Sequence, residues 1–165
     1  MTPPLPLDND DELVTAAWIA TIPGFTAEMT GAQLPPDTDE HGKPAAWLRT
    51  GFVTVASVGG TPDDMLPVNR PVMEVKCWAA VPGSDDPPWL MARALASAIQ
   101  RAVWQRKGVN RLLTINVNGR AYPPAVVQGA YMAQTFRRIY ADPGDYACYQ
   151  ADMGLTWITV GDRIP

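Results

Sequence analysis

The chain has 165 residues, of which 47% are hydrophobic, and this is enough apolar material for the core of one globular domain. Charged residues make up only 18% of the sequence, and the formal net charge is −4. The apolar runs are far too short to cross a bilayer, and no basic residue precedes the first of them. We therefore expect neither a membrane segment nor a signal peptide.

Cys77 and Cys148 are the only cysteines. Two cysteines so far apart match neither a disulfide framework nor a metal-binding spacing. We expect them to be reduced, buried thiols in a protein that is made in a cytoplasm.

Charges are segregated along the chain. No lysine or arginine precedes Lys43, whereas the same segment holds the acids Asp8, Asp10, Asp11, Glu12, Glu28, Asp37, Asp39 and Glu40. Residues 87–141 contain no acid, and their basic residues are Arg93, Arg101, Arg106, Lys107, Arg111, Arg120, Arg137 and Arg138. The two sets are either solvated faces of one domain that neutralise each other, or a bipolar surface suited to head-to-tail association or to charged partners.

In chain order, residues 1–8 are a proline-rich arm that we expect to be flexible, and residues 9–165 are expected to form one domain. Asp8 or Asn9 is a candidate cap for a first helix, which Pro23-Gly24 ends. The proline-rich and glycine-rich composition of residues 24–46 is typical of a loop.

Two strands are expected next. The segment from Trp47 to Val58 is rich in β-branched residues, and the segment from Pro71 to Val81 alternates strictly. Met73, Val75 and Cys77 fall on one face of the second segment, which predicts a half-buried antiparallel strand. The polar link between the two strands is a candidate flexible loop.

A second helix is predicted after residue 86. Asp86 is its candidate N-cap, with Pro87 at the first helical position and Gly108 at the end. A polar stripe that contains Arg93 and Arg101 recurs at helical spacing among small apolar residues, which suit close packing on a sheet.

The last third of the chain contains an extension and a hairpin. Within residues 106–128, the Asn118-Gly119 turn signal and the Pro123-Pro124 interruption favour a small extension over a central strand. Residues 131–160 form two strands around an Asp-Pro-Gly-Asp turn at 142–145. The resulting order, α-β-β-α-β-β, predicts an α+β domain with a four-stranded antiparallel or mixed sheet and two helices on one face.

Residues for catalysis are scarce. His41 is the only histidine, and its polar surroundings are typical of a solvated loop. None of the three serines lies in a nucleophile elbow, and phosphate-binding and dinucleotide motifs are absent from the sequence. We predict no catalytic, cofactor-binding or metal site.

Nucleic-acid binding is a possible role for the acid-free interval. Its arginines would neutralise phosphates, and Trp104 or Tyr122 would stack on bases. The whole chain is nevertheless acidic, with a pI near 4.8, and no recognised nucleic-acid-binding motif is present. We therefore keep dedicated nucleic-acid recognition only as a minor alternative.

Arg137 and Arg138 are neighbours on a predicted strand and should point to opposite faces. One of them would then lie over the packed face or against a neighbouring subunit, where it needs a partner. Alternatively, the pair protects an edge strand from aggregation.

Several segments, taken in order, carry a family resemblance. They are Asp11-Glu12-Leu13-Val14 with Trp18, Phe52-Val53-Thr54-Val55 with Gly59-Gly60, Val75-Lys76-Cys77-Trp78-Ala79, Arg137-Arg138, Asp142-Pro143, Tyr146-Ala147-x-Tyr149 and Leu155-Thr156-Trp157. Together they resemble the tail terminator proteins of long-tailed bacteriophages, especially phages of actinobacteria. The similarity covers most of residues 9–160.

The resemblance implies a structural virion protein without catalysis or cofactor. Such proteins form a ring, typically a hexamer, on the head-proximal end of the tail tube, end tube polymerisation, and dock the head-completion or neck protein. The family has no fixed interface motif. From the charges, we name as candidate interface or lumen residues Asp10, Asp11, Glu12, Arg93, Arg101, Arg106, Lys107, Arg137 and Arg138. DNA passing through the lumen would contact some of them without sequence specificity.

Other classes of protein stay open at this point. A head-closure connector or a tail tube protein shares the virion context. A small-molecule-binding or enzymatic α+β domain would use the polar link between residues 59 and 70 as a lid, and the scarcity of histidine and serine counts against it.

Overall fold

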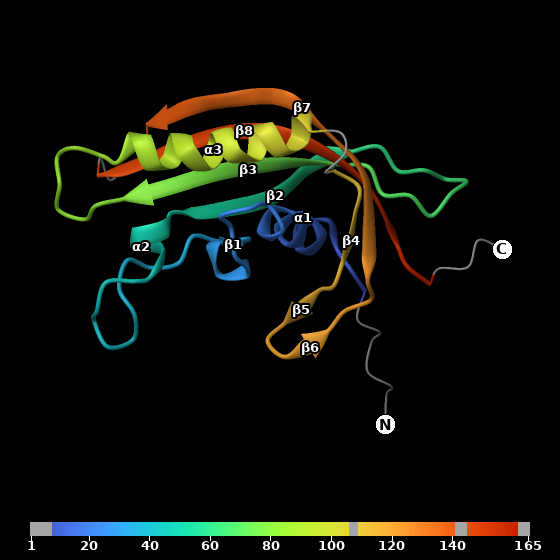
Figure 1. Ribbon diagram of the computed structural model, residues 1–165, viewed down its shortest axis with the longest axis horizontal. Helices are drawn as coiled ribbons and strands as arrows, with labels where there is room; N and C mark the ends of the chain where they lie inside the picture. Colours follow the sequence, from blue (N-terminus) through green and yellow to red (C-terminus); the bar gives the residue numbers. More distant parts are fainter. Residues whose placement is uncertain (1–7, 106–108, 141–144, 162–165) are drawn as a thin grey trace.

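The computed structural model describes residues 8–105, 109–140 and 145–161 (Figure 1). Residues 1–7 of the predicted arm, the basic residues Arg106 and Lys107, the predicted helix end at Gly108, and most of the predicted turn at 142–145 lie outside the described residues.

A six-stranded sheet forms the body of the molecule, in the order β1-β2-β3-β8-β7-β4. The strands are β1 (Thr30–Gly31), β2 (Phe52–Gly60), β3 (Pro71–Ala80), β4 (Arg111–Leu113), β7 (Ala125–Tyr140) and β8 (Tyr146–Thr159). β1 runs parallel to β2, and the other neighbours are antiparallel, so the sheet is mixed. The strands β5 (Asn116–Val117) and β6 (Arg120–Ala121) pair separately as a small hairpin.

Within the described residues, three α-helices accompany the sheet: α1 (Asp11–Ala20), the short α2 (Trp47–Thr50) and α3 (Trp89–Trp104). A 3₁₀ turn spans Ala27–Met29. The six long elements follow the predicted order α-β-β-α-β-β, and the α+β class is confirmed. The predicted four strands and two helices were too few, because β1, β4 and α2 are too short to produce a hydrophobic period.

One face of the sheet is buried under α1 and α3. Alternate residues of β3, namely Met73, Val75 and Cys77, are fully buried on this face, as the alternation predicts. They form one core cluster with the apolar sides of both helices, which include Val14, Trp18, Ile19, Leu95, Ile99 and Val103. The indole Nε1 of Trp18 donates a hydrogen bond to the carbonyl of Val109, 3.1 Å away, and this bond ties α1 to the segment that follows α3.

The opposite face, here called the polar face, carries Thr54, Glu74, Lys76, Gln150 and Asp152, all of them half-buried. It is covered at one end, where a second apolar cluster of Trp47, Phe52 and Ala80 forms beneath α2. Figure 1 shows the long helix α3 lying along the sheet while the ends of β7 and β8 curl away from it.

The N-terminal ends of the two long helices, α1 and α3, differ from the predicted ones. Asp10, rather than Asp8 or Asn9, caps α1, and its carboxylate accepts a hydrogen bond from the amide of Leu13 at 2.7 Å. α3 begins at Trp89 with no side-chain cap, so Asp86 is not its N-cap. A proline disfavours helical geometry in the residue before it, and the Pro87-Pro88 pair therefore keeps residues 86 and 87 out of the helix.

The segment from Trp47 to Thr50 is helical, although the sequence predicts a strand there. The strand starts after Gly51, which has φ of +76°. A Cβ on this residue would lie 2.5 Å from Cδ1 of Leu95 and 3.0 Å from the carbonyl oxygen of Trp78. Glycine is therefore required for the chain to turn from α2 into β2 beneath α3.

The predicted extension at 106–128 is divided between two structures. The β5–β6 hairpin is separate from the main sheet, and its turn places Asn118 and Gly119 at φ of 50° and 75°, as the Asn-Gly signal predicts. In contrast, β4 joins the sheet edge and β7 already begins at Ala125, so part of this segment belongs to the sheet. The apolar residues at both ends drive this, since Leu113, Ala125 and Val127 enter the main core.

The β7–β8 hairpin is the longest pairing in the sheet, and β7 changes register at three places along it. Such bulges bend a strand and increase its twist. β4 pairs with β7 only at residues 125–127, so the outer edge of β7 from Gln128 to Tyr140 has no strand partner in the described part of the chain. Gly154 of β8 pairs with Tyr131 of β7, whose aromatic ring lies directly over the glycine.

We predict that Gly154→Ala destabilises the fold by about 1–3 kcal/mol, because the added methyl group would overlap the Tyr131 ring and force it to move. Urea denaturation measures this change. Gly129→Ala is the matched control, because a Cβ on Gly129 of the same hairpin would meet nothing within 4 Å. In a Tyr131→Ala background the cost of Gly154→Ala should largely disappear. An unchanged cost would show that the ring contact is not its cause.

Candidate functional site

The described residues contain no group of three or more histidine, cysteine, aspartate or glutamate side chains that is able to hold a metal ion. In the same residues, no helix is both long enough and apolar enough to cross a membrane. His41 lies on the surface, 3.6 Å from the carboxylate of Glu40. The candidate functional features described below are exposed surfaces.

The surface of the described residues is hollowed in at least two places. One, of about 580 Å³, lies within the β2–β3 hairpin, between residues 57 and 71 and beside Asp11. The other, of about 990 Å³, lies between α1 and the β5–β6 hairpin and is lined partly by Leu13, Ala17 and Tyr122. Neither hollow is lined by histidine or cysteine.

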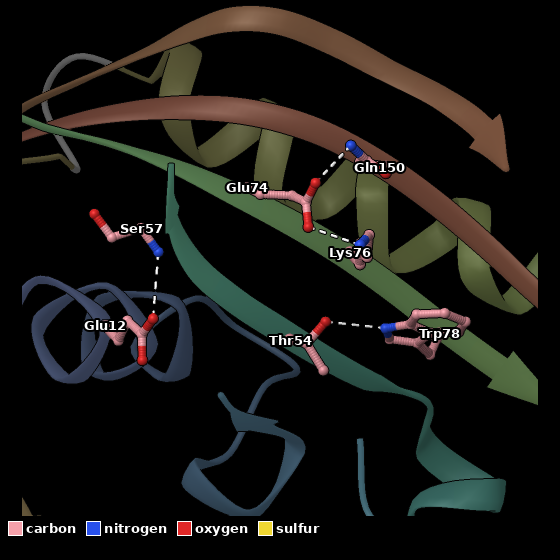
Figure 2. A network of polar contacts seen from close by, with 7 residues as sticks. All are labelled: Glu12, Thr54, Ser57, Glu74, Lys76, Trp78 and Gln150. Atoms are coloured by element: carbon pink, nitrogen blue, oxygen red, sulfur yellow. Dashed lines mark hydrogen bonds and ion pairs between the residues drawn. The ribbon is translucent and has the colours of Figure 1, made fainter. Parts of the chain in front are cut away.

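The predicted acidic residues lie together at the start of α1, and each holds an intramolecular contact. Asp10 caps the helix, as described above. Asp11 accepts a hydrogen bond at 2.9 Å from the indole of Trp157 on β8. Glu12 accepts one at 3.3 Å from the backbone amide of Ser57 on β2, and Figure 2 shows this bond. The structure therefore uses these acids to attach α1 to two strands.

The predicted basic residues Arg93 and Arg101 lie on the exposed side of α3. Neither has a hydrogen bond or ion pair within the described part of the chain. Their helical side, here called the α3 outer face, consists of Leu90, Arg93, Ala94, Ser97, Arg101 and Trp104. Leu90 and Trp104, at its two ends, are 82% and 64% exposed. Sequence periodicity identifies the basic stripe, but only the structure shows that large apolar side chains flank it.

Arg137 and Arg138 point to opposite faces of the sheet. Arg137 is paired with Gln150 of the polar face, and Arg138 is paired with Tyr149. The guanidinium carbon of Arg138 lies 4.3 Å from the ring centroid of Trp89, the first residue of α3. Hydrogen bonds to the phenol oxygens of Tyr149 and Tyr140 raise the pKa of Arg138, so its charge is retained. Both arginines are exposed, but Arg138 joins β7 to α3, whereas Arg137 lies on the polar face and makes no such contact.

The polar face carries a network that spans three strands (Figure 2). Glu74 accepts a hydrogen bond from Gln150 at 2.8 Å and forms an ion pair with Lys76 at 2.7 Å. The indole of Trp78 donates to the hydroxyl of Thr54 at 3.0 Å. Polar groups with such partners are stable beside water, so this face does not need a covering layer.

The tip of the β2–β3 hairpin, residues 61–70, is ordered by its own contacts. The carboxylate of Asp63 accepts hydrogen bonds from the amides of Met65 and Leu66, both at 3.0 Å, and these bonds lower the pKa of Asp63. Asp63 also forms an ion pair with Arg70 at 3.3 Å. The turn holds Met65 in solvent, with 92% of its surface exposed. The sequence predicts only a polar loop here, because no local pattern shows which side chain points outward.

No protein-family model and no curated protein matches the chain. Among solved structures, one chain whose name states no function aligns with 91% of this chain and with 95% of its own length. The two are 15% identical in sequence, with a TM-score of 0.38, and this level of similarity carries no argument about function.

We predict that Arg138→Gln lowers the urea midpoint of unfolding, because glutamine loses the charge that stacks on Trp89 and bonds the two phenols. Arg137→Gln is the matched control and should leave the midpoint nearly unchanged, since it removes the same charge one residue away. In a Trp89→Ala background the effect of Arg138→Gln should shrink. Equal effects of the two arginine variants would contradict the assignment of Arg138 to the α3 contact.

We predict that both thiols are unreactive in the folded protein. Cys77 and Cys148 are fully buried, and burial raises the pKa of both thiols, that of Cys148 to about 12. A chromogenic disulfide reagent at neutral pH should label no thiol in the native state and both after denaturation. Burial favours the neutral form of the thiol. The contribution of Cys148 to the free energy of unfolding is therefore complete below the pKa of about 8.5 that a thiol has in the unfolded chain, and this contribution is lost as the pH rises toward 12. Rapid native labelling would contradict the prediction.

Proposed function

We propose that the protein is a structural subunit of a bacteriophage virion, a tail terminator. Copies of it form a ring, most simply a hexamer, on the head-proximal end of the tail tube. The ring ends polymerisation of the tube protein and presents a docking surface to the head-completion or neck protein. The proposal requires neither a cofactor nor a catalytic residue.

One observation carries the proposal beyond the family resemblance. The described residues present distinct exposed surfaces on different sides of one sheet. The α3 outer face is basic and has apolar side chains at both ends. The hairpin tip exposes the apolar side chain of Met65. On the polar face, charged and polar side chains contact one another. A ring subunit meets its two neighbours through different patches, and this arrangement supplies different patches.

The charges support the same proposal after one revision. Arg93 and Arg101 are available for an acidic neighbour, and Arg137 is available on the polar face. Asp10, Asp11 and Glu12 are engaged in attaching α1, so they are weaker candidates for a subunit contact. If the polar face lines the lumen, its paired charges and Arg137 would let DNA pass without holding it in one register.

Tube assembly tests the proposed function. Added to polymerising tail tube protein, the purified chain should shorten the tubes as its concentration rises, and electron micrographs should show a ring at one end of each tube. The chain alone should form closed rings by light scattering and negative-stain imaging. Open-ended tubes formed by the chain alone would instead identify a tube protein. A monomer that leaves tube length unchanged would contradict the proposal.

A further inference from the structure

Two exposed surfaces of the chain complement each other in charge and in apolar character. The α3 outer face has two arginines without a partner in the described residues, placed between Leu90 and Trp104. The hairpin tip has the exposed acid Asp64 beside Met65 and Leu66, which are 92% and 48% exposed. Large apolar side chains with this exposure beside an uncompensated charge are typical of a contact surface.

Hydrogen bonds and an ion pair within the hairpin tip hold its conformation, although the tip lies outside the core. The carboxylate of Asp63 closes the turn by accepting hydrogen bonds from two backbone amides and by its ion pair with Arg70. The amide of Asn69 donates to the carbonyl of Trp157 at 2.9 Å. A loop that is ordered before binding loses little conformational entropy when it docks. Met65 is thereby presented as a preformed anchor.

The α3 outer face matches this tip in size. Arg93 and Arg101 are eight residues apart, which corresponds to about 12 Å along a helix. Ala94 and Ser97 lie between them on the helix surface. Because these two side chains are small, a loop tip is able to come close to the helix between the two arginines. The carboxylate of Asp64 would then lie between two guanidinium groups, while Met65 beside it covers the helix surface around Ala94 and Ser97.

The two surfaces of one chain do not meet each other. In Figure 1 the β2–β3 hairpin projects past the end of α3, and its tip lies beyond the C-terminal turn of that helix. The hairpin is held in that direction by its ladder, in which Gly60 pairs with Pro71. A contact between the tip and the helix face therefore requires a second copy of the chain.

We propose that the hairpin tip of one copy docks on the α3 outer face of the next copy, with Asp64 between Arg93 and Arg101. The contact joins different patches of identical chains, so it is heterologous and closes into a ring when the rotation permits. This inference rests on the proposed ring and names the surfaces that build it.

Cysteine cross-linking tests the contact directly. Both native cysteines are buried, so they should not contribute cross-links of their own. A Met65→Cys chain mixed with a Ser97→Cys chain should yield a disulfide-linked pair under mild oxidation, whereas each variant alone should not. Thr135→Cys, exposed on β7, replaces Ser97→Cys in the matched control mixture, which should remain unlinked. Equal cross-linking in both mixtures, or none in the first mixture, would overturn the inference.

A charge exchange provides an independent readout. Asp64→Arg alone and the double variant Arg93→Glu, Arg101→Glu alone should each raise the protein concentration needed for assembly by about tenfold or more. An equimolar mixture should restore assembly, because every interface of an alternating ring then joins opposite charges. Unchanged assembly of the single components, or no recovery in the mixture, would overturn the inference. Circular dichroism should show that both variant chains fold normally, because the substituted side chains are exposed.

The outcomes separate this inference from the proposed function. If the wild-type chain forms rings that cap tubes but the Met65→Cys and Ser97→Cys chains do not cross-link, the contact is refuted and the function is left intact. A specific cross-link in a protein that does not change tube length would support the contact and refute the terminator function.

Discussion

The structure depends on the burial of one face of its sheet. Val53, Val75 and Met73 on this face contact the apolar sides of α1 and α3, and all three are excluded from water. Burial of one such side chain stabilises a fold by about 1.5–3 kcal/mol, which is more than any single exposed ion pair of the molecule is expected to contribute. The strict alternation of β3 places its apolar side chains on this buried face. Because side chains alternate along a strand, the same alternation places Glu74 and Lys76 on the other face, where they pair with each other.

Because only one face of the sheet is buried beneath the helices, the exposed surfaces lie on different sides of the molecule. α3 uses one side to cover the sheet, so its arginines face solvent. On the polar face, Glu74 contacts both Lys76 and Gln150. The β2–β3 hairpin extends beyond the core and is closed by Asp63. An assembly subunit needs several such surfaces at fixed angles to one another, and a rigid sheet holds them there. The proposed terminator ring makes use of this arrangement.

Local chemistry predicted the long elements correctly and the short ones poorly. The β3 alternation, the Asn118-Gly119 turn and the order of the six long elements all follow from patterns of a few residues. β1 and β4 have two and three residues, and they join the sheet only because neighbouring strands offer them an edge. The helix at Trp47–Thr50 forms although its residues favour a strand, since Trp47 enters a cluster with Phe52 and Ala80 that no local pattern indicates.

By itself, the sequence determined the α+β class, the buried thiols, the basic stripe on the second helix and the opposite directions of Arg137 and Arg138, because each follows from periodicity or composition within one segment. Only the tertiary structure decided what those charges do. Arg138 stacks on Trp89 and the acids of α1 bind distant strands, whereas Arg93, Arg101 and Arg137 are left exposed. The physical reason is that a charge becomes structural or available according to which partner lies within hydrogen-bonding distance, and those partners are distant in sequence.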